Sequence, residues 1–383
     1  MFPMIHIFIG TKAQFIKMAP IMQKLNERGI AYNFIDSGQH ASITIDLIKQ
    51  FGLRPPDVYL RKKNGNIRTI PQALLWATRS LSSPLFSPKQ SLKIIFNNQV
   101  GICLIHGDTL STLISLVYAK RCGLKVAHVE SGLRSYHPFD PFPEELVRLV
   151  AMRFSDILYA SSEWAFNNLC KMGYQNKTIN VRYNTGMDAV RFAVKQVRGK
   201  NRPKPPYVVV TIHRLETIYS RTRLKMIVKL IKRISRQQQV IFVLHEPTKQ
   251  QLIKFDLLSS LSHSTSVEIL PLVPYIEFVN LIAGANFIVT DGGSIQEECY
   301  YLNKPCMVMR SKTERIEGLG ENVQLVEFNP IQIEFFLENY SSFKREEFKE
   351  NISPSEIILD NLPPWLFGTR EGAGQSKLPD VLR

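Results

Sequence analysis

One short segment of the sequence combines an anion-binding backbone pattern with acidic side chains. Residues 287–289 are an apolar run typical of a buried strand, residues 291–294 are Asp-Gly-Gly-Ser, and a helical pattern follows. Free backbone N–H groups and the dipole of a helix N-terminus favour a bound anion. Glu297 and Glu298 lie in the first turns of that helix, where a bare phosphate would meet carboxylates. The segment therefore indicates a phosphate attached to a group with hydroxyls, as in a nucleotide or a nucleotide sugar.

Further titratable side chains follow other predicted strands. Asp108, Glu130 and His213 each come after an apolar run, and Glu144 opens a predicted helix after a proline. In open α/β sheets, ligands bind at the carboxyl ends of the strands, where such side chains meet. A cleft with these groups has several candidates for general acid–base work. Because clustered carboxylates cannot all stay ionised cheaply, we expect one of them to have a raised pKa and to serve as an acid.

Each of these residues also has a plain structural interpretation. Asp108 suits the N-cap of the next helix, Glu144 suits the positive end of a helix dipole, and a lone histidine such as His213 is more often structural than catalytic. The argument for a site is that all of them fall at the same end of their strands, in both halves of the chain. Metal binding is the rival use of the carboxylates, but the sequence has no spaced His/Cys ligand set, so we predict no metal site.

Strand and helix patterns alternate along the chain, which predicts parallel sheets. A break rich in proline and basic residues, 199–206, indicates an exposed connection between two such series. The 383 residues are enough for two domains. We therefore predict an α/β protein with two doubly wound, Rossmann-like domains that face a central cleft. Strands are expected at 5–10, 31–36, 101–106, 126–130, 157–160, 207–211, 240–244, 267–270, 287–290 and 304–309, and helices at 17–27, 110–121, 144–154, 224–236 and 275–283.

The composition argues against several classes of protein. The five cysteines are scattered and form no C-x-x-C pair, which predicts a reducing, cytoplasmic setting rather than a disulfide framework. The first ten residues have the pattern of a strand, not of a signal peptide, and no apolar run approaches the roughly 18 residues of a membrane span. The net charge of +15 suits a solvated basic surface or polyanionic small substrates. Because the basic residues are spread out, we predict no nucleic-acid partner.

Six motifs, taken together, give the chain a resemblance to a known family. They are HGDT (106–109), HVESGLRS (128–135), FPEELVR (142–148), the T-x-HR around His213, DGGSIQEE (291–298) and KTERIEG (312–318). In this order they resemble the non-hydrolysing UDP-N-acetylglucosamine 2-epimerases, which have the GT-B fold of many glycosyltransferases. The resemblance covers about residues 5–325. It implies domains at 1–190 and 191–345, and a segment 346–383 in which a helix at 353–359 returns to the N-terminal domain. The tail after residue 361 has turn residues and no periodicity, so we expect it to be loosely ordered.

The resemblance also implies a reaction and a set of roles. The family inverts C2 of the sugar in UDP-GlcNAc to give UDP-ManNAc by eliminating UDP and adding it back, which needs no redox cofactor. Such enzymes commonly form homodimers and supply surface polysaccharides. By resemblance, Asp108, Glu130 and Glu144 are the acid–base carboxylates, His213 stands at the diphosphate, and Glu298 accepts from the ribose. Further substrate contacts are implied for Lys12, Lys17, Arg134, Arg214, Gly292, Gly293, Ser294 and Arg315.

Some departures from the family pattern leave the substrate open. The first loop, 10–14, is GTKAQ in place of GTRPE, so that a point charge replaces a guanidinium fork and an amide replaces a carboxylate. The phosphate loop has DGGS for DSGG, Val147 stands for an asparagine, and SGQH at 37–40 stands for TGQH, part of the region where bacterial members bind an activating UDP-GlcNAc. A uronic or otherwise modified UDP-N-acetylhexosamine is therefore an alternative substrate. A GT-B glycosyltransferase, a non-catalytic UDP-sugar sensor and a hydrolysing variant are alternative functions.

Overall fold

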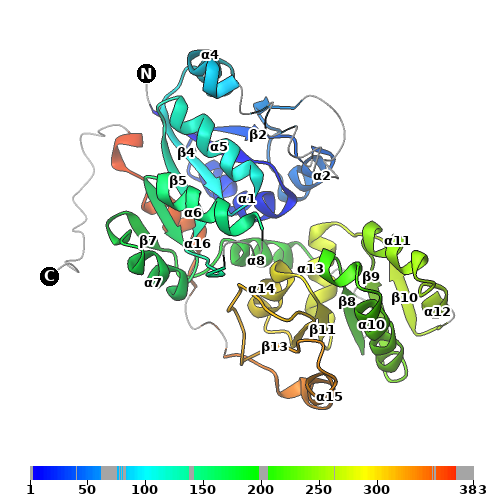
Figure 1. The fold of residues 1–383 in the computed structure, drawn as a ribbon. Helices are drawn as coiled ribbons and strands as arrows, with labels where there is room; N and C mark the ends of the chain where they lie inside the picture. Colours follow the sequence, from blue (N-terminus) through cyan, green and yellow to red (C-terminus); the bar gives the residue numbers. More distant parts are fainter. Residues whose placement is uncertain are drawn as a thin grey trace.

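The computed structural model describes residues 3–39, 41–61, 76, 78, 80, 83–137, 142–197, 206–262, 264–346, 348 and 351–367. It contains two parallel sheets, one in each half of the chain (Figure 1). Their strand orders are β3-β2-β1-β4-β5-β6-β7 and β10-β9-β8-β11-β12-β13, and every pairing between these strands is parallel. In each sheet the order reverses beside the first strand, which is the switch point of a doubly wound fold. The predicted fold class is confirmed.

The first sheet is built from short strands with helices on both faces, and its five inner strands are almost fully buried. A parallel sheet covered on both sides needs near-continuous apolar strands, as in the MIHIFI sequence of its first strand. Its strands are β1 (Met4–Ile9), β2 (Tyr32–Asp36), β3 (Val58–Tyr59), β4 (Gly101–His106), β5 (Lys125–Ser131), β6 (Ile157–Ala160) and β7 (Thr178–Asn180). Its helices are α1 (Lys12–Glu27), α2 (Ala41–Phe51), α4 (Pro88–Ile95), α5 (Leu110–Arg121), α6 (Glu144–Phe154) and α7 (Glu163–Lys171).

The second sheet repeats this plan with its own core. Its first strand, YVVVT, is buried along its whole length. The strands are β8 (Tyr207–Thr211), β9 (Gln239–Val243), β10 (Val267–Leu270), β11 (Ile288–Thr290), β12 (Cys306–Val308) and β13 (Val323–Leu325). The helices are α9 (Leu215–Ile218), α10 (Arg221–Ile234), α11 (Glu246–Lys254), α12 (Ser259–Ser262), α13 (Tyr275–Gly284), α14 (Gly293–Tyr301) and α15 (Pro330–Asn339).

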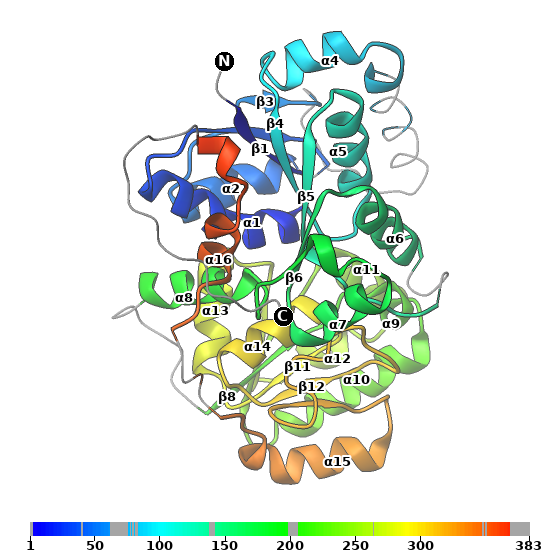
Figure 2. The ribbon, with the colours of Figure 1, turned by 90° about the vertical axis from the view of Figure 1, so that its left-hand side faces the viewer.

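Two helices tie the halves together. Helix α8 (Gly186–Gln196) packs against α1 on one side and against α13 and α14 on the other. Helix α16 (Pro354–Asp360) lies beside α1 (Figure 2), where Lys24 and Arg28 form ion pairs with Glu356 and Asp360 at 2.9 and 2.6 Å. Helix α16 therefore packs against the first helix of the N-terminal half. The predicted domain boundaries stay a prediction, and residue 190 lies within α8.

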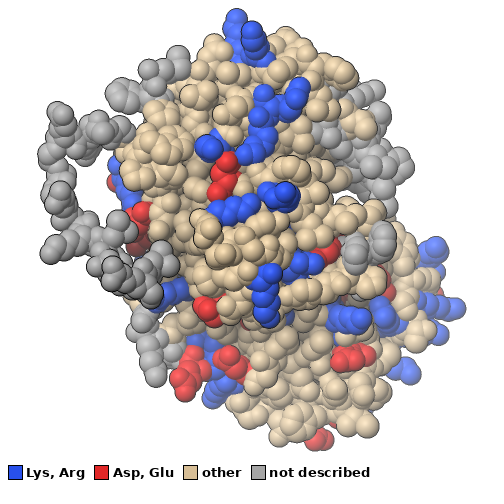
Figure 3. Space-filling model, turned by 60° about the vertical axis from the view of Figure 1, so that its left-hand side comes forward, with Lys and Arg blue, Asp and Glu red and all other residues tan. Residues whose placement is uncertain are grey.

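Other expectations for the chain ends and connections have mixed outcomes. The prediction that everything after residue 361 is loosely ordered is wrong for Pro364–Phe367, which form a 3-10 turn with Leu366 buried against the core of the first half. Residues 368–383 and residues 199–205 of the predicted connection 199–206 lie outside the described residues. Among the described helices, none is long and apolar enough to cross a membrane. On the face in Figure 3, basic side chains are dispersed among neutral ones.

Candidate active site

Two adjoining cavities lie at the carboxyl ends of the central strands of both sheets. The polar cavity, of about 210 Å³, is lined mainly by charged and glycine residues, and the apolar pocket, of about 390 Å³, mainly by aliphatic and aromatic side chains. Both share Thr11, Lys17, His213 and Ser294 in their walls. The polar cavity brings together the predicted residues Asp108, Glu130, Glu144, Lys17, His213, Arg214, Gly292, Gly293, Ser294 and Arg315. Lys12 and Glu298 line the apolar pocket.

The first loop is fixed to the loop that carries Asp108. Gln14 and Thr11 cap α1 reciprocally, and the Gln14 side-chain oxygen accepts from the backbone N–H of Gly10 at 2.9 Å. The Gln14 amide nitrogen donates to the His106 carbonyl at 2.7 Å and to Thr109 Oγ1 at 3.0 Å. An ionised glutamate could not donate these two bonds, since a carboxylate only accepts. The departure from the usual glutamate at position 14 therefore has a structural use in this chain.

Glu130 belongs to a closed ring of four buried charges. Lys17 Nζ lies 2.6 Å from Glu130 Oε2 and 2.8 Å from Glu297 Oε2. Arg315 closes the ring, with one Nη 2.6 Å from Glu130 Oε1 and the other 2.5 Å from Glu297 Oε1. Asn184 Nδ2 also donates to Glu130 Oε2, at 2.5 Å. Although burial alone would raise it, the pKa of Glu130 is held well below its usual value by Arg315 and Lys17.

The backbone at Glu130 is strained. Its φ angle is +63°, in the left-handed region that a side chain other than glycine seldom adopts, and the ladder between β5 and β6 shifts register between Val129 and Ser131. Such a conformation costs of the order of 1 kcal/mol or more and persists where the surroundings impose it. The bulge lets a strand residue turn its carboxylate to the end of the sheet, into the ring.

Asp108 and Glu144 lie on the same wall but in different environments. Asp108 Oδ2 accepts from Arg148, with Nη2 at 2.6 Å, and Arg148 also lies 3.3 Å from the buried Glu145. Burial raises the pKa of Glu144, and the nearby Asp108 raises it further. Sequence reasoning missed Arg148, although its spacing of four residues from Glu144 on a helix places both on one face. The expectation that one carboxylate has a raised pKa is met by Glu144, not by Glu130.

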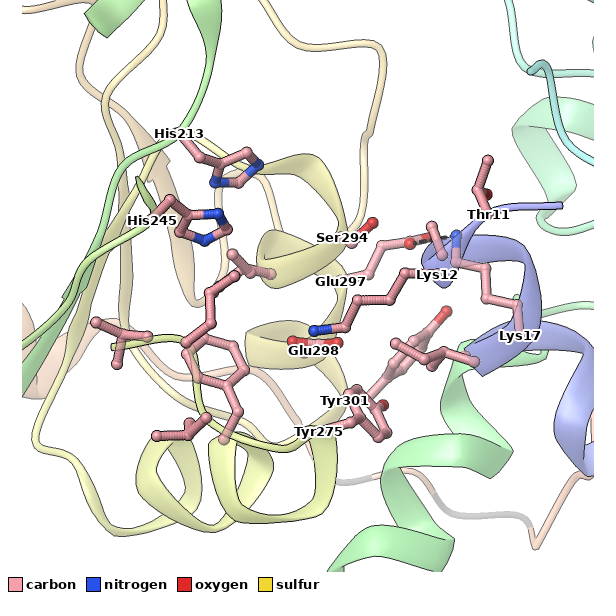
Figure 4. Close-up of a pocket in the computed structure, with 18 residues that line it drawn as sticks. Thr11, Lys12, Lys17, His213, His245, Tyr275, Ser294, Glu297, Glu298 and Tyr301 are labelled. Carbon is pink, nitrogen blue, oxygen red and sulfur yellow. Dashed lines mark hydrogen bonds and ion pairs between the residues drawn. The ribbon is translucent and has the colours of Figure 1, made fainter. Parts of the chain in front are cut away.

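Neighbouring residues hold His213 beside the loop at residues 291–294, called the phosphate loop here. Asp291 accepts from the backbone N–H groups of His213 and Arg214 at 2.9 and 3.0 Å. The imidazole of His213 stacks on His245, with ring centroids 4.7 Å apart (Figure 4). Burial, and then the charge of Arg214, lowers the pKa of His213 to about 4, so the ring is neutral near pH 7 and can donate a hydrogen bond. Sequence reasoning missed His245, which follows the end of β9 as His213 follows β8.

The glycines of the phosphate loop have no room for side chains. A Cβ on Gly292 would lie 2.6 Å from His213 Cε1, and one on Gly293 would lie 3.2 Å from Arg315 Cγ. Gly292 is the N-cap of α14, and the helix begins at Gly293, so that its free N–H groups start at the cavity wall. This is a backbone surface that an anion can approach closely, between a neutral imidazole and a guanidinium.

The apolar pocket places Lys12 and Glu298 among hydrophobic walls. Its walls include Val243, Leu272 and Phe278, and Lys12 extends toward Glu298 across its interior (Figure 4). Loss of hydration raises the pKa of Glu298 to about 8, and the positive charge of Lys12 acts against this rise. The pocket therefore combines an apolar lining with a carboxyl group that can form hydrogen bonds to a ligand.

Arg134 is the predicted site residue that lies apart from both cavities. Its Nε donates to Glu145 Oε1 at 2.5 Å, and its guanidinium covers the ring of Tyr136. Within the described part of the chain, Arg134 is linked to the polar cavity through Glu145, which also contacts Arg148. A group of three or more His, Cys, Asp and Glu side chains placed to hold a metal ion is absent from the described part of the chain.

The fold and the site together define the class of the protein. Two facing, doubly wound domains with a cleft between the carboxyl ends of their strands are the GT-B fold. Residues 23–353 match the profile of the UDP-N-acetylglucosamine 2-epimerase family, so the chain belongs to this family of isomerases.

Individual relatives agree with this assignment. A UDP-N-acetylglucosamine 2-epimerase of Methanococcus maripaludis is 30% identical over 335 residues, which are 84% of this chain and 87% of the relative. The structure of the Methanocaldococcus jannaschii UDP-GlcNAc 2-epimerase with UDP-GlcNAc and UDP is similar, with a TM-score of 0.78 at 29% identity over 93% of this chain and 98% of that one. The Neisseria meningitidis UDP-GlcNAc 2-epimerase, at 24% identity, covers 94% of this chain and 98% of that one with a TM-score of 0.79, which shows the same fold.

Proposed function

We propose that the protein interconverts UDP-GlcNAc and UDP-ManNAc by eliminating UDP and adding it back. The observation that carries this proposal is the contrast between two carboxylates in one cavity. Glu130 is held ionised by two cations, whereas Glu144 is biased toward its protonated form. Inversion of C2 needs a base on one face of the sugar and an acid on the other, and environments that push two pKa values apart assign those roles.

The proposed reaction has two steps, an elimination and an addition. In the first, Glu130 takes the C2 proton of one epimer, the C–H electron pair forms the C1–C2 double bond, and the C1–O bond electrons leave with UDP. In the second, Glu144 donates a proton to the opposite face of C2, and the UDP oxygen bonds again to C1. Asp108 is ion-paired to Arg148 and lies near Glu144, and it would relay a proton from solvent back to Glu144. In the reverse direction the two roles exchange.

The two cavities divide the substrate between them. The uracil and ribose would occupy the apolar pocket, with Glu298 accepting from ribose hydroxyls beside Lys12. The diphosphate would lie against the N–H groups at Gly292, Gly293 and Ser294. Lys17, Arg315 and the neutral His213 would then stabilise the charge that UDP gains when it leaves. Arg214, which also lines the polar cavity, would add a further positive charge.

The substrate and setting are part of the same proposal. A relative 26% identical over 326 residues is the Pseudomonas aeruginosa UDP-2,3-diacetamido-2,3-dideoxy-D-glucuronate 2-epimerase, which supports a modified UDP-N-acetylhexosamine as the second candidate substrate. We propose that the product supplies a surface polysaccharide. The five free cysteines support a cytoplasmic setting, and a homodimer is proposed from the family resemblance.

Proton NMR of the protein with UDP-GlcNAc in deuterated water tests the proposal. We expect a growing UDP-ManNAc signal with deuterium at C2, because a two-base mechanism exchanges the abstracted proton with solvent. UDP that accumulates with free sugar would indicate the hydrolysing variant. UDP binding without any product would contradict the assigned substrate, and the same assay with the diacetamido-glucuronate sugar nucleotide would follow. No turnover with either sugar would favour the glycosyltransferase or sensor alternatives.

A further inference from the structure

Glu297 is a buried carboxylate to which the proposed reaction assigns no role. It is 2% exposed and lies on α14 one residue before Glu298. It lines the apolar pocket but not the polar cavity, whereas Lys17, Glu130 and Arg315 all line the polar cavity. Glu297 therefore reaches the reacting groups through its contacts with Lys17 and Arg315, at 2.8 and 2.5 Å, as Figure 4 shows for Lys17.

The ring of charges joins the two halves of the protein crosswise. Lys17 and Glu130 come from α1 and β5 of the first half, and Glu297 and Arg315 come from α14 and the segment after β12 in the second. Each cation contacts one carboxylate from each half, so the four charges sum to zero. Buried charges are tolerated where they are fully paired, and removal of one partner leaves another uncompensated.

Proton abstraction disturbs this balance. When Glu130 takes the C2 proton it becomes neutral, and Lys17 and Arg315 lose half of their negative partners. At the same time the departing UDP gains a negative charge beside Arg315, whose side chain borders Gly293 in the phosphate loop. The two cations can then turn their free N–H bonds to the diphosphate while Glu297 still holds both of them.

We propose that Glu297 is a positioning residue that keeps Lys17 and Arg315 in place while their partner changes from Glu130 to the departing diphosphate. The inference rests on the proposed epimerase function and adds a role to a residue outside the reaction cavity. Glu297 also moderates the positive charge around Glu130. With Glu297 present, Glu130 remains basic enough to accept the proton, and UDP is bound loosely enough to be released and added back.

The proposal predicts opposite effects on turnover and on UDP affinity. In Glu297→Gln the ring carries one net positive charge before reaction, which favours the ionised form of Glu130 and any bound diphosphate. We expect kcat to fall on the order of 100-fold and UDP to bind roughly tenfold more tightly, with KM falling in parallel. A variant that merely disturbs the fold would weaken UDP binding, so tighter binding with slower turnover separates a positioning role from a structural one.

Two further variants control for charge, reach and folding. Glu297→Asp keeps the charge but is too short to span both cations, so we expect UDP affinity within about threefold of wild type and an intermediate kcat. Glu317→Gln alters a neighbouring buried carboxylate whose oxygens have no hydrogen-bond partner among the described residues. Glu317 lines a different cavity, with Ser161 and Trp164. We expect its kcat and UDP affinity to stay within about twofold of wild type, because it does not contact the ring.

The experiment combines UDP titration calorimetry with steady-state NMR assays of the full chain. Wild-type protein that binds UDP but produces no epimer overturns the proposed function, whereas the calorimetric predictions for Glu297 still apply. If the wild-type protein is active and Glu297→Gln has the same kcat, the role of Glu297 is overturned. The role is also overturned if folded Glu297→Gln binds UDP more weakly than the wild type. If Glu317→Gln reproduces the Glu297→Gln effects, the field and not the contact is responsible, and the proposal fails. If Glu297→Gln does not fold, Glu297→Asp decides, and wild-type kcat there overturns it.

Discussion

The two cavities of the site share walls but are built on different physical principles. The apolar pocket gathers side chains such as Leu272, Val273 and Phe278 around Lys12 and Glu298. The polar cavity holds mostly charges that are paired with one another. Apolar burial stabilises the ground state and the transition state alike, so it contributes to affinity. Charges that can change partners contribute most to stabilising a transition state in which charge develops on the substrate. In the proposed function, nucleotide binding therefore belongs to the apolar pocket and the chemistry to the polar cavity.

Removal of Glu130 should have the largest effect, because it takes away the base but leaves the binding surfaces. In Glu130→Gln we expect kcat to fall by about 10³-fold or more. UDP should bind at least as well as to wild type, since Lys17 and Arg315 then carry excess positive charge. The NMR assay and UDP calorimetry measure the two quantities. Normal turnover in this variant would remove Glu130 from the mechanism, and loss of UDP binding would show that the cavities are not separable.

A side chain on Gly292 should weaken binding at the border between the two regions. A Cβ there would lie 2.6 Å from His213 Cε1, so Gly292→Val must displace either the imidazole or the start of α14. We expect UDP affinity to fall about 100-fold, with a smaller loss of the same sign in Gly292→Ala. Calorimetry with UDP, beside thermal melting as a check of folding, measures this. Unchanged affinity in the valine variant would place the diphosphate elsewhere.

A change in the apolar pocket alone should affect binding without chemistry. Leu272 is half exposed at the wall of the pocket, so the fold does not depend on it. Leu272→Ala should raise KM roughly fivefold, equivalent to about 1 kcal/mol of lost apolar burial, and leave kcat within about twofold. Ile253→Ala removes an exposed aliphatic side chain that lines neither cavity and is the matched control. A fall in kcat for Leu272→Ala would contradict the division of labour.

The sequence predicted the strands that build these regions better than the elements at their edges. Strands such as β4 and β8 are continuous apolar runs, so their pattern is unambiguous. The edge strands β3 and β7 have two and three residues, too short to show a period, and both were missed. Helix α1 begins at Lys12, five residues before the predicted start at 17, although Thr11 and Gln14 carry the capping-box signature that could have located it.

The site could be predicted as a set of residues but not as a set of partners. Local motifs single out Asp108, Glu130 and Glu144, and the structure places all three in the lining of the polar cavity. The contact between Lys17 and Glu297 joins residues 280 positions apart, and no local spacing encodes it. Arg315 was predicted to meet the substrate, and in the structure it is already bound to two carboxylates. The pairing of the charged side chains depends on how the two halves pack together. The directions of the pKa shifts therefore follow from the structure and not from the sequence pattern.

The smallest predicted effect is on the pH dependence of stability, to which the two cavities should contribute differently. Burial raises the pKa of Glu298 in the apolar pocket to about 8 and that of Glu317 to about 7. A carboxyl whose folded pKa is raised binds its proton more tightly in the folded state, so its contribution to stability is lost as pH rises from about 4.5 through the folded value. Burial lowers the pKa of four histidines to about 4, and their contribution is lost as pH falls below 6.5.

We therefore expect thermal stability to be greatest near pH 6.5, with an acid limb from the histidines and an alkaline limb from the two carboxyls. Differential scanning fluorimetry between pH 5 and 9 measures the melting temperature directly. Glu298→Gln should flatten the part of the alkaline limb near pH 8, on the order of 2 °C, because an amide needs no proton to stay neutral in the pocket. The acid limb, to which His6 and His128 contribute from the core of the first half, should be unchanged. If the variant keeps the full alkaline limb, Glu298 is ionised in the folded protein, and the apolar pocket then tolerates a charge in the way that the polar cavity does.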